Sequence, residues 1–279
     1  MDQWLDYPRE AGVGHTVVGT VKVLKGLWSP QLHNRRDILV YLPPSYGVRE
    51  RRYPVIYMQD GQNLFDEATS YAGEWCVDET MEALSKEGIE AIVVGVPNQG
   101  ASRLDEYSPF ADRHANGGQG DSYLAFLVRT LKPRIDRDFR TLPGRAHTTI
   151  MGSSMGGLIS LYAAFRYAGT FGAAGVMSPS IWFADRAILS YVRKALFVPG
   201  KIYMDMGLSE SHGMVSDARR MRTLLCQKGY RLGHDLLYIE ERHGRHTESA
   251  WAGRLPTALH FLILHPRGRA RPYLLTGDR

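Results

Sequence analysis

The chain has 279 residues, 44% of them hydrophobic and 10% aromatic, and a formal net charge of +5 at pH 7. This composition is sufficient for a folded core and excludes an intrinsically disordered chain. No apolar run reaches the roughly 18 residues that a membrane span needs. The arginines are scattered and form no basic stripe with interleaved aromatic residues, which argues against nucleic-acid binding.

The length fits one α/β domain covering residues 1–279, with a basic C-terminal tail at about 266–279. The first 13 residues contain acids and a proline but no apolar core of a secretion signal. The two cysteines, Cys76 and Cys226, are each expected inside a helix as reduced thiols. We therefore expect a cytoplasmic protein that binds no membrane, and the sequence leaves its oligomeric state open.

The first half of the chain predicts four strands and two helices. Runs rich in β-branched and apolar residues predict strands at 17–24, 37–42, 55–58 and 91–96, the first two as an antiparallel pair. Helical spacing of apolar residues predicts helices at 77–84 and 121–135, with Asp121 as N-cap and a kink at Pro133. The glycine-rich loop 114–120 between them is either an active-site flap or a plain surface loop.

In the second half, strand-like and helix-like segments alternate. The predicted strands are 148–150, 173–177, 202–206 and 236–239, and the predicted helices are 158–165, 187–194, 214–225 and 247–264. This alternation favours an α/β fold with a mostly parallel central sheet and helices on both faces. In such a sheet the functional site lies at the carboxyl ends of the strands.

The segment Gly152-Ser153-Ser154-Met155-Gly156 lies between a predicted strand and a predicted helix. This G-x-S-x-G pattern is typical of a nucleophile elbow, in which small neighbours leave room for a sharply bent serine. The N-terminus of the following helix presents free N–H groups to an anion formed there. Ser154 is therefore the candidate nucleophile.

A serine nucleophile needs a histidine base, and the base needs an acid that orients it. Two histidines follow the last predicted strand, and we favour His246 over His243 because it directly precedes the terminal helix, where Trp251 anchors the chain. The acid is expected at the end of the strand near 202–206. Glu210 follows that strand end and is the first choice, whereas Asp205 lies within the strand and is the second.

The reaction also needs two N–H donors for the oxyanion. We expect them to be the backbone amides of Met155, after the nucleophile, and Gln62, in the loop after the third strand. The main rival chemistry is a metal site, for which the nearby histidines and acids are candidates (His212, Glu240, Glu241, His243 and His246). These residues complete no known metallohydrolase motif, so we expect neither a metal nor a cofactor.

The chain resembles the putative esterase family of α/β-hydrolases, which includes enterochelin, esterase D and feruloyl esterases, from about residue 35 to 264. The resemblance rests on these motifs in this order: Val40-Tyr41-Leu42-Pro43-Pro44-Ser45-Tyr46, Tyr57 to Phe65, Arg103 with Glu106-Tyr107-Ser108-Pro109, Gly152 to Gly157, Gly207-Leu208-Ser209-Glu210, and His246 to Trp251. It implies that Ser154, Glu210 and His246 match the triad and that Gln62 and Met155 match the oxyanion hole.

We therefore expect a serine esterase that acts through an acyl-enzyme on a small or acyl-sugar type ester. An acyltransferase that uses an alcohol acceptor and a non-catalytic binding domain on the same scaffold are the alternatives. Candidate substrate contacts are Asp60, Arg103, Tyr107 and Trp182, although Arg103 and Glu106 also suggest an ion pair that braces a loop.

Overall fold

The computed structural model describes residues 3–10, 12 and 14–263, so the predicted basic tail lies outside the described residues. The described chain forms a nine-stranded sheet in the order β1-β2-β3-β5-β4-β8-β9-β10-β11. Its strands are β1 (Trp4–Asp6), β2 (Thr20–Ser29), β3 (Asn34–Leu42), β4 (Val55–Gln59), β5 (Ile92–Val96), β8 (Thr148–Ser153), β9 (Ala173–Met177), β10 (Lys201–Gly207) and β11 (Leu236–Glu241).

The sheet is antiparallel at one end and parallel over the rest. The pairs β1–β2, β2–β3 and β3–β5 are antiparallel, which confirms the antiparallel opening pair. From β5 to β11 each pair is parallel. The strands β4, β8, β10 and β11 therefore end at the same edge of the sheet, and their following loops meet there.

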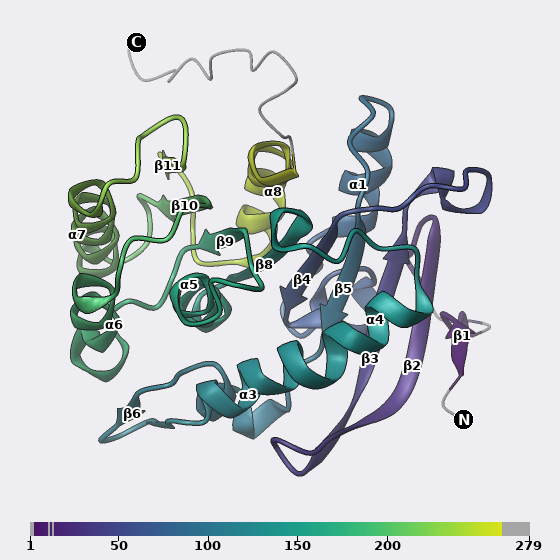
Figure 1. Cartoon of the computed structure of the whole chain (residues 1–279), viewed down its shortest axis with the longest axis horizontal. Coiled ribbons are helices and arrows are strands. Elements are labelled where there is room, and N and C mark those ends of the chain that lie inside the picture. The colour runs from purple at the N-terminus through teal and green to yellow at the C-terminus, as the bar shows by residue number, and fades with distance from the viewer. Residues whose placement is uncertain (1–2, 11, 13, 264–279) are drawn as a thin grey trace.

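Helices cover both faces of the sheet (Figure 1). One face packs against α1 (Val77–Ser85) and α8 (Glu248–Ile263), and the other packs mainly against α3 (Gly120–Phe126), α4 (Lys132–Asp138), α5 (Met155–Arg166), α6 (Phe183–Lys194) and α7 (His212–Lys228). Two separate hydrophobic clusters fill these layers. The predicted α/β class with a mostly parallel, two-faced sheet is confirmed.

Two local expectations were wrong by a few residues. The N-cap of α3 is Gln119 rather than Asp121, since the helix begins at Gly120. Gly120 packs closely, because an added Cβ would lie 2.5 Å from the Pro109 nitrogen. Cys76 precedes α1 at a φ of 53° and so lies outside the helix. Before α4 the chain forms a π-helical stretch at Leu127–Leu131, because the ring of Pro133 has no N–H for the usual ladder.

The predicted 114–120 loop is partly ordered. Its residues lie in and after a short hairpin of β6 (Ala111–Asp112) and β7 (Asn116–Gly117), which follows the short helix α2 (Arg103–Glu106). The Asp112 carboxylate accepts a hydrogen bond from the Ala184 amide, so the hairpin is joined to α6. Among the described residues, no helix is long and apolar enough to cross a membrane.

Candidate active site

Ser154 lies in the sharp turn between β8 and α5, at the carboxyl edge of the sheet. Its backbone has φ 55° and ψ −120°, which is uncommon for a residue with a side chain. The turn is held because the Ser154 amide donates to the Met177 carbonyl and the Ser154 carbonyl accepts from the amides of Ser180 and Leu158, each at 3.0 Å. The strained conformation is therefore tied to β9 as well as to its own helix.

The glycines beside Ser154 are required by close packing. A Cβ on Gly152 would lie 2.7 Å from Cγ of Gln59, and one on Gly156 would lie 2.9 Å from Cβ of Gln59. A Cβ on Gly157 would lie 2.9 Å from the Met177 carbonyl oxygen. These distances leave no space for side chains, so the three glycines let β4 and β9 approach the turn.

Three side chains from three loops form one hydrogen-bonded chain. Nε2 of His246 lies 3.0 Å from Oγ of Ser154, and Nδ1 of His246 lies 2.7 Å from Oε2 of Glu210. Oε1 of Glu210 also accepts hydrogen bonds from the Ser178 hydroxyl at 2.6 Å and the Gly207 amide at 3.0 Å. This geometry matches that of a nucleophile, a base and an orienting acid.

The Glu210 carboxylate is favoured in its ionised form. Burial raises its pKa, but hydrogen bonds from His246, Ser178 and the Gly207 amide outweigh that effect and hold the pKa below its usual value. The side chain of Glu210 has no exposed surface, whereas that of His246 is 34% exposed. His246 therefore faces the solvent side and Glu210 lies behind it.

The two second choices take other places. His243 is exposed, and no hydrogen bond joins it to a described member of the triad. Asp205 is fully buried and pairs with Arg254, with Nε of Arg254 3.0 Å from its Oδ2. Burial raises the pKa of Asp205, while the Arg254 guanidinium opposes that rise.

The amides predicted to form the oxyanion hole lie on two sharp turns. Gly61–Asn63 is a 3-10 turn entered from Asp60 at φ 55°. A Cβ on Gly61 would lie 2.6 Å from the nitrogen of Val96, so only glycine permits this approach to β5. Among the described residues, none accepts a hydrogen bond from the backbone amides of Gln62 or Met155. Both amides are therefore available to an acceptor outside the chain.

Asp60, Arg103 and Tyr107 hold this loop together. Nε and Nη2 of Arg103 bind the two carboxylate oxygens of Asp60 at 2.7 and 2.8 Å. The Tyr107 hydroxyl accepts from the Asp60 amide at 3.0 Å, and Tyr107 is completely buried. Its contact with substrate stays a prediction. The expected ion pair between Arg103 and Glu106 is wrong, because Glu106 pairs with Arg36 in a buried contact of 2.7 Å.

Trp182 is 46% exposed and immediately precedes α6, two residues after Ser180. The Ser180 hydroxyl lies 3.1 Å from Oγ of Ser154, so the segment from Ser180 to Trp182 begins beside Ser154. The first turn of α6 is left-handed, with positive φ at Ala184 and its two successors. Its Arg186 binds the buried Asp217 carboxylate at 2.8 Å, which joins the unusual turn to α7.

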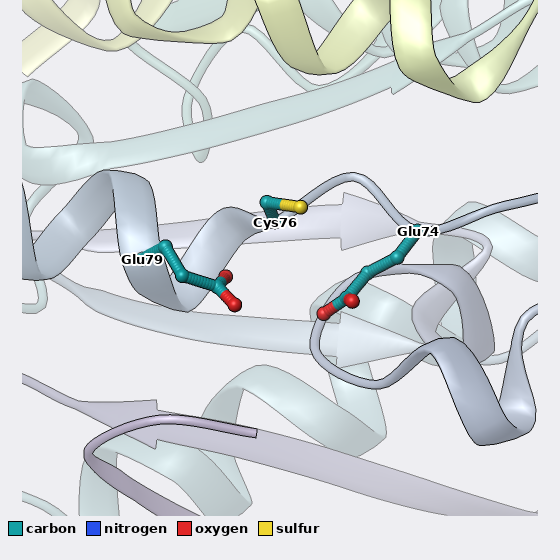
Figure 2. Close-up of side chains that lie close together, drawn as sticks. All are labelled: Glu74, Cys76 and Glu79. Atoms are coloured by element: carbon teal, nitrogen blue, oxygen red, sulfur yellow. The ribbon is translucent and has the colours of Figure 1, made fainter. Parts of the chain in front are cut away.

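The structure does not bring together the histidine and acid set considered as a rival metal site. Among the described residues, the group with suitable ligand atoms is Glu74, Cys76 and Glu79, whose atoms lie within 4.8 Å of one another (Figure 2). Burial and nearby acids raise the pKa of the Cys76 thiol to about 11 and also raise that of Glu74. Glu79 lies in the first turn of α1, where a helix N-terminus stabilises an acid without a metal.

A cavity of about 640 Å³ adjoins the loop that carries the Gln62 amide. Its lining residues come from the N-terminal segment, β2, β3 and the loops after β4 and β5, and include Tyr7, Val23, Leu39, Gln62 and Pro97. The lining combines these residues with charged side chains of both signs, among them Glu10, Lys25, Arg35 and Asp37.

Sequence reasoning missed three residues of the hydrogen-bond network around Ser154 and Glu210. Ser178, Ser180 and Arg254 each lie within hydrogen-bond distance of the triad or of one another. One available signal was the Ser178-Pro179-Ser180 segment directly after the predicted strand 173–177. The other was Arg254, a charged residue beside the apolar positions Trp251 and Leu255 of the terminal helix.

The sheet order, the strand–serine–helix elbow and the histidine after the last strand define an α/β-hydrolase. A sequence model of the family described as "Putative esterase" matches residues 29–262, and the chain belongs to this family. It is accordingly a carboxylic ester hydrolase, which confirms the expected class.

Similar proteins agree with this placement. The uncharacterized protein YbbA of Bacillus subtilis is 26% identical over 232 residues, covering 78% of this chain and 89% of that protein. The siderophore enterobactin esterase of Emericella nidulans is 27% identical over 162 residues, covering 52% of this chain and 51% of that protein. The crystal structure of BES protein from Bacillus cereus has a TM-score of 0.71 at 22% identity and covers 92% of this chain and 100% of that one, which supports the fold.

Proposed function

We propose that this esterase uses Ser154, His246 and Glu210 as a catalytic triad and acts through an acyl-enzyme. The observation that carries the proposal is the unbroken hydrogen-bonded chain from Oγ of Ser154 through both ring nitrogens of His246 to Oε2 of Glu210. A core residue has no need of such a chain at a strained, partly exposed turn.

In the proposed mechanism, Oγ of Ser154 attacks the ester carbonyl while Nε2 of His246 accepts the hydroxyl proton. Glu210 accepts the hydrogen bond from Nδ1–H, which sets the tautomer and stabilises the imidazolium. The tetrahedral oxyanion accepts hydrogen bonds from the amides of Gln62 and Met155, each contributing about 3–4 kcal/mol. His246 then protonates the leaving alcohol, and water attacks the acyl-enzyme by the same steps.

The proposed substrate is a small or acyl-sugar type ester. The cavity of about 640 Å³ that Gln62 lines is large enough for one substituent of such an ester, on the Gln62 side of the site. The exposed indole of Trp182 offers an apolar surface to the other substituent. Asp60 and Arg103 bind one another and support the loop, so their contribution to substrate binding is indirect.

The test is hydrolysis of a series of p-nitrophenyl acyl esters by the wild type and by Ser154→Ala. We expect the alanine variant to lose at least about 10³-fold in kcat, and the wild type to show a burst of p-nitrophenol from the acyl-enzyme. The neighbouring Ser153→Ala is the matched control and is expected to stay within a few-fold of the wild type. Full turnover by Ser154→Ala would refute the serine mechanism.

The same assay separates the alternative functions. When an acceptor alcohol is added, a hydrolase still converts the acyl group mainly into free acid. An acyltransferase converts it mainly into the ester of the added alcohol. A binding domain without catalysis releases no p-nitrophenol from any ester of the series. Each outcome is read from the products by chromatography.

A further inference from the structure

We propose that the 178–180 turn, backed by the buried Asp205–Arg254 pair, is the device that positions both ends of the triad. The inference rests on the proposed function and adds Ser178, Ser180 and Arg254 to it as positioning residues. The turn follows β9, between the strand that leads to Ser154 and the strand that leads to Glu210. Its two hydroxyl groups therefore reach the nucleophile on one side and the acid on the other.

At one end of the turn, Ser180 holds the nucleophile. Its amide donates to the Ser154 carbonyl at 3.0 Å, and its hydroxyl lies 3.1 Å from Oγ of Ser154. At the other end, the Ser178 hydroxyl lies 2.6 Å from Oε1 of Glu210. Pro179 between them fixes one backbone angle, so the separation of the two hydroxyls is set by a short, stiff segment.

The direction of the Ser178 hydroxyl is dictated by its partners. Nε1 of Trp251 lies 3.0 Å away and Nη2 of Arg254 lies 2.9 Å away, and both groups are donors only. Together they occupy the two acceptor positions of the hydroxyl oxygen. Its single proton is therefore left for Glu210, which makes Ser178 a permanent donor to the catalytic carboxylate rather than a freely rotating one.

Arg254 is itself held by a second buried network. Asp205 accepts from Nε of Arg254, from the Tyr203 hydroxyl at 2.9 Å and from the Ser178 amide at 3.0 Å. The backbone and the side chain of Ser178 are thus both bound to the same ion pair. This double attachment holds Ser178 at a φ of 38°, an unfavourable value for serine that points its hydroxyl at Glu210.

The same pair also contacts the loop that carries the base. A Cβ on Gly244 would lie 2.7 Å from Nη1 of Arg254, so Gly244 packs directly against the guanidinium. Gly244 in turn accepts a hydrogen bond from the Ser209 amide, next to Glu210, at 3.0 Å. Arg254 therefore lies beside the point where the loop that carries Glu210 contacts the loop that carries His246. Trp251, from the same helix, places its ring 4.9 Å from that of His246.

The expected consequence is a loss in kcat without a loss in substrate binding. In Ser178→Ala the carboxylate of Glu210 loses one donor and its fixed orientation, and we expect kcat to fall about 10- to 100-fold. KM should change by less than about twofold, since no atom of this network lines the described cavity beside Gln62. Trp251→Phe removes only one donor and keeps a ring against His246, so a smaller fall of about 2- to 5-fold is expected.

The experiment is a double-mutant cycle on p-nitrophenyl ester hydrolysis with Ser178→Ala, Glu210→Gln and the double variant. If Ser178 acts through Glu210, its substitution changes kcat by less than about twofold once Glu210 is replaced. Ser160→Ala is the matched control, because Ser160 is equally buried and its hydroxyl bonds only the Gly156 carbonyl at 2.7 Å. Thermal unfolding of each variant by circular dichroism shows that the compared proteins are folded.

Two results overturn the inference. One is Ser178→Ala with kcat within twofold of the wild type, and the other is the same fold loss from Ser178→Ala whether or not Glu210 is present. If Ser178→Ala is too unstable to assay, Trp251→Phe in the same cycle decides the question by whether its own fold loss in kcat disappears once Glu210 is replaced. Failure of the proposed function is recognised separately, because Ser154→Ala then retains turnover whatever the Ser178 variants do.

Discussion

Glu210 and Asp205 are both buried acids at the end of β10, and their replacement is expected to have opposite consequences. In Glu210→Gln the amide keeps the shape but no longer offers a carboxylate to Nδ1 of His246, which lies 2.7 Å from Oε2. Loss of the orienting acid in such triads costs about 10⁴-fold in kcat, equivalent to about 5.5 kcal/mol of transition-state stabilisation. The other two hydrogen bonds of Glu210 persist, so the loss of thermal stability should be clearly smaller than that expected for Asp205→Asn.

Asp205→Asn instead breaks a buried ion pair in which Arg254 and Asp205 have 5% and 0% exposed side chains. Removal of one partner of such a pair leaves an uncompensated charge and typically costs about 3–5 kcal/mol. For a protein of this size that corresponds to a fall of about 6–20 °C in the unfolding temperature. Since Asp205 acts on the triad only through Arg254 and Ser178, kcat of the folded variant should fall no more than about 100-fold.

Both variants are assayed by p-nitrophenyl ester kinetics below their melting range and by thermal unfolding with circular dichroism. The expected pattern is a large loss of kcat with a small loss of stability for Glu210→Gln, and a large loss of stability with residual activity for Asp205→Asn. The reverse pattern, with Asp205→Asn stable and inactive and Glu210→Gln active, would show that the acid has been assigned to the wrong residue.

Three further outcomes are expected. Gly156→Ala should lower kcat at least about 100-fold and reduce stability, because the added Cβ would lie 2.9 Å from Cβ of Gln59. Gly213→Ala should match the wild type in activity, because a Cβ added there would meet no atom of the described residues beyond its own helix within 4 Å. Because the pKa of Glu210 is lowered in the folded state, its contribution to stability is present above the unfolded-state pKa of about 4.3 and disappears as the pH falls through the folded-state pKa. In urea unfolding from pH 7 to pH 3, the difference in unfolding free energy between wild type and Glu210→Gln should therefore shrink. A constant difference would contradict this. Arg103→Ala should lower kcat about 10-fold by loosening the oxyanion loop, while Arg166→Ala, from an exposed ion pair, should not, and equal effects in steady-state assays would argue against the loop's role.

The fold class followed from the sequence because hydrophobic periodicity reports on local structure. Alternating apolar strands and helices were enough to predict a two-faced parallel sheet, and the order of Ser154, Glu210 and His246 along the chain placed each after a strand end. The elbow was predicted for the same reason, since its small residues are adjacent in the sequence; in the fold, a Cβ on its glycines would lie only 2.7–2.9 Å from other atoms.

Local signals failed where the partner of a residue is distant in the chain. The sequence paired Arg103 with Glu106 because they are neighbours, whereas the fold pairs Arg103 with Asp60, 43 positions away, and Glu106 with Arg36, 70 positions away. Charge complementarity acts through space, and a sequence does not state which ends of the sheet will meet.

What the sequence by itself determined is the strand–serine–helix elbow, the sheet that presents it, and the candidate identity of the acid and the base. Only the tertiary structure decided that Asp205 pairs with Arg254, and that Ser178 joins that pair to Glu210. The physical reason is that β9, β10 and α8 are far apart in the chain and become neighbours only when the sheet closes its core. The Ser178 hydroxyl accepts from two donors and faces the Glu210 carboxylate only because these three elements lie together in the fold.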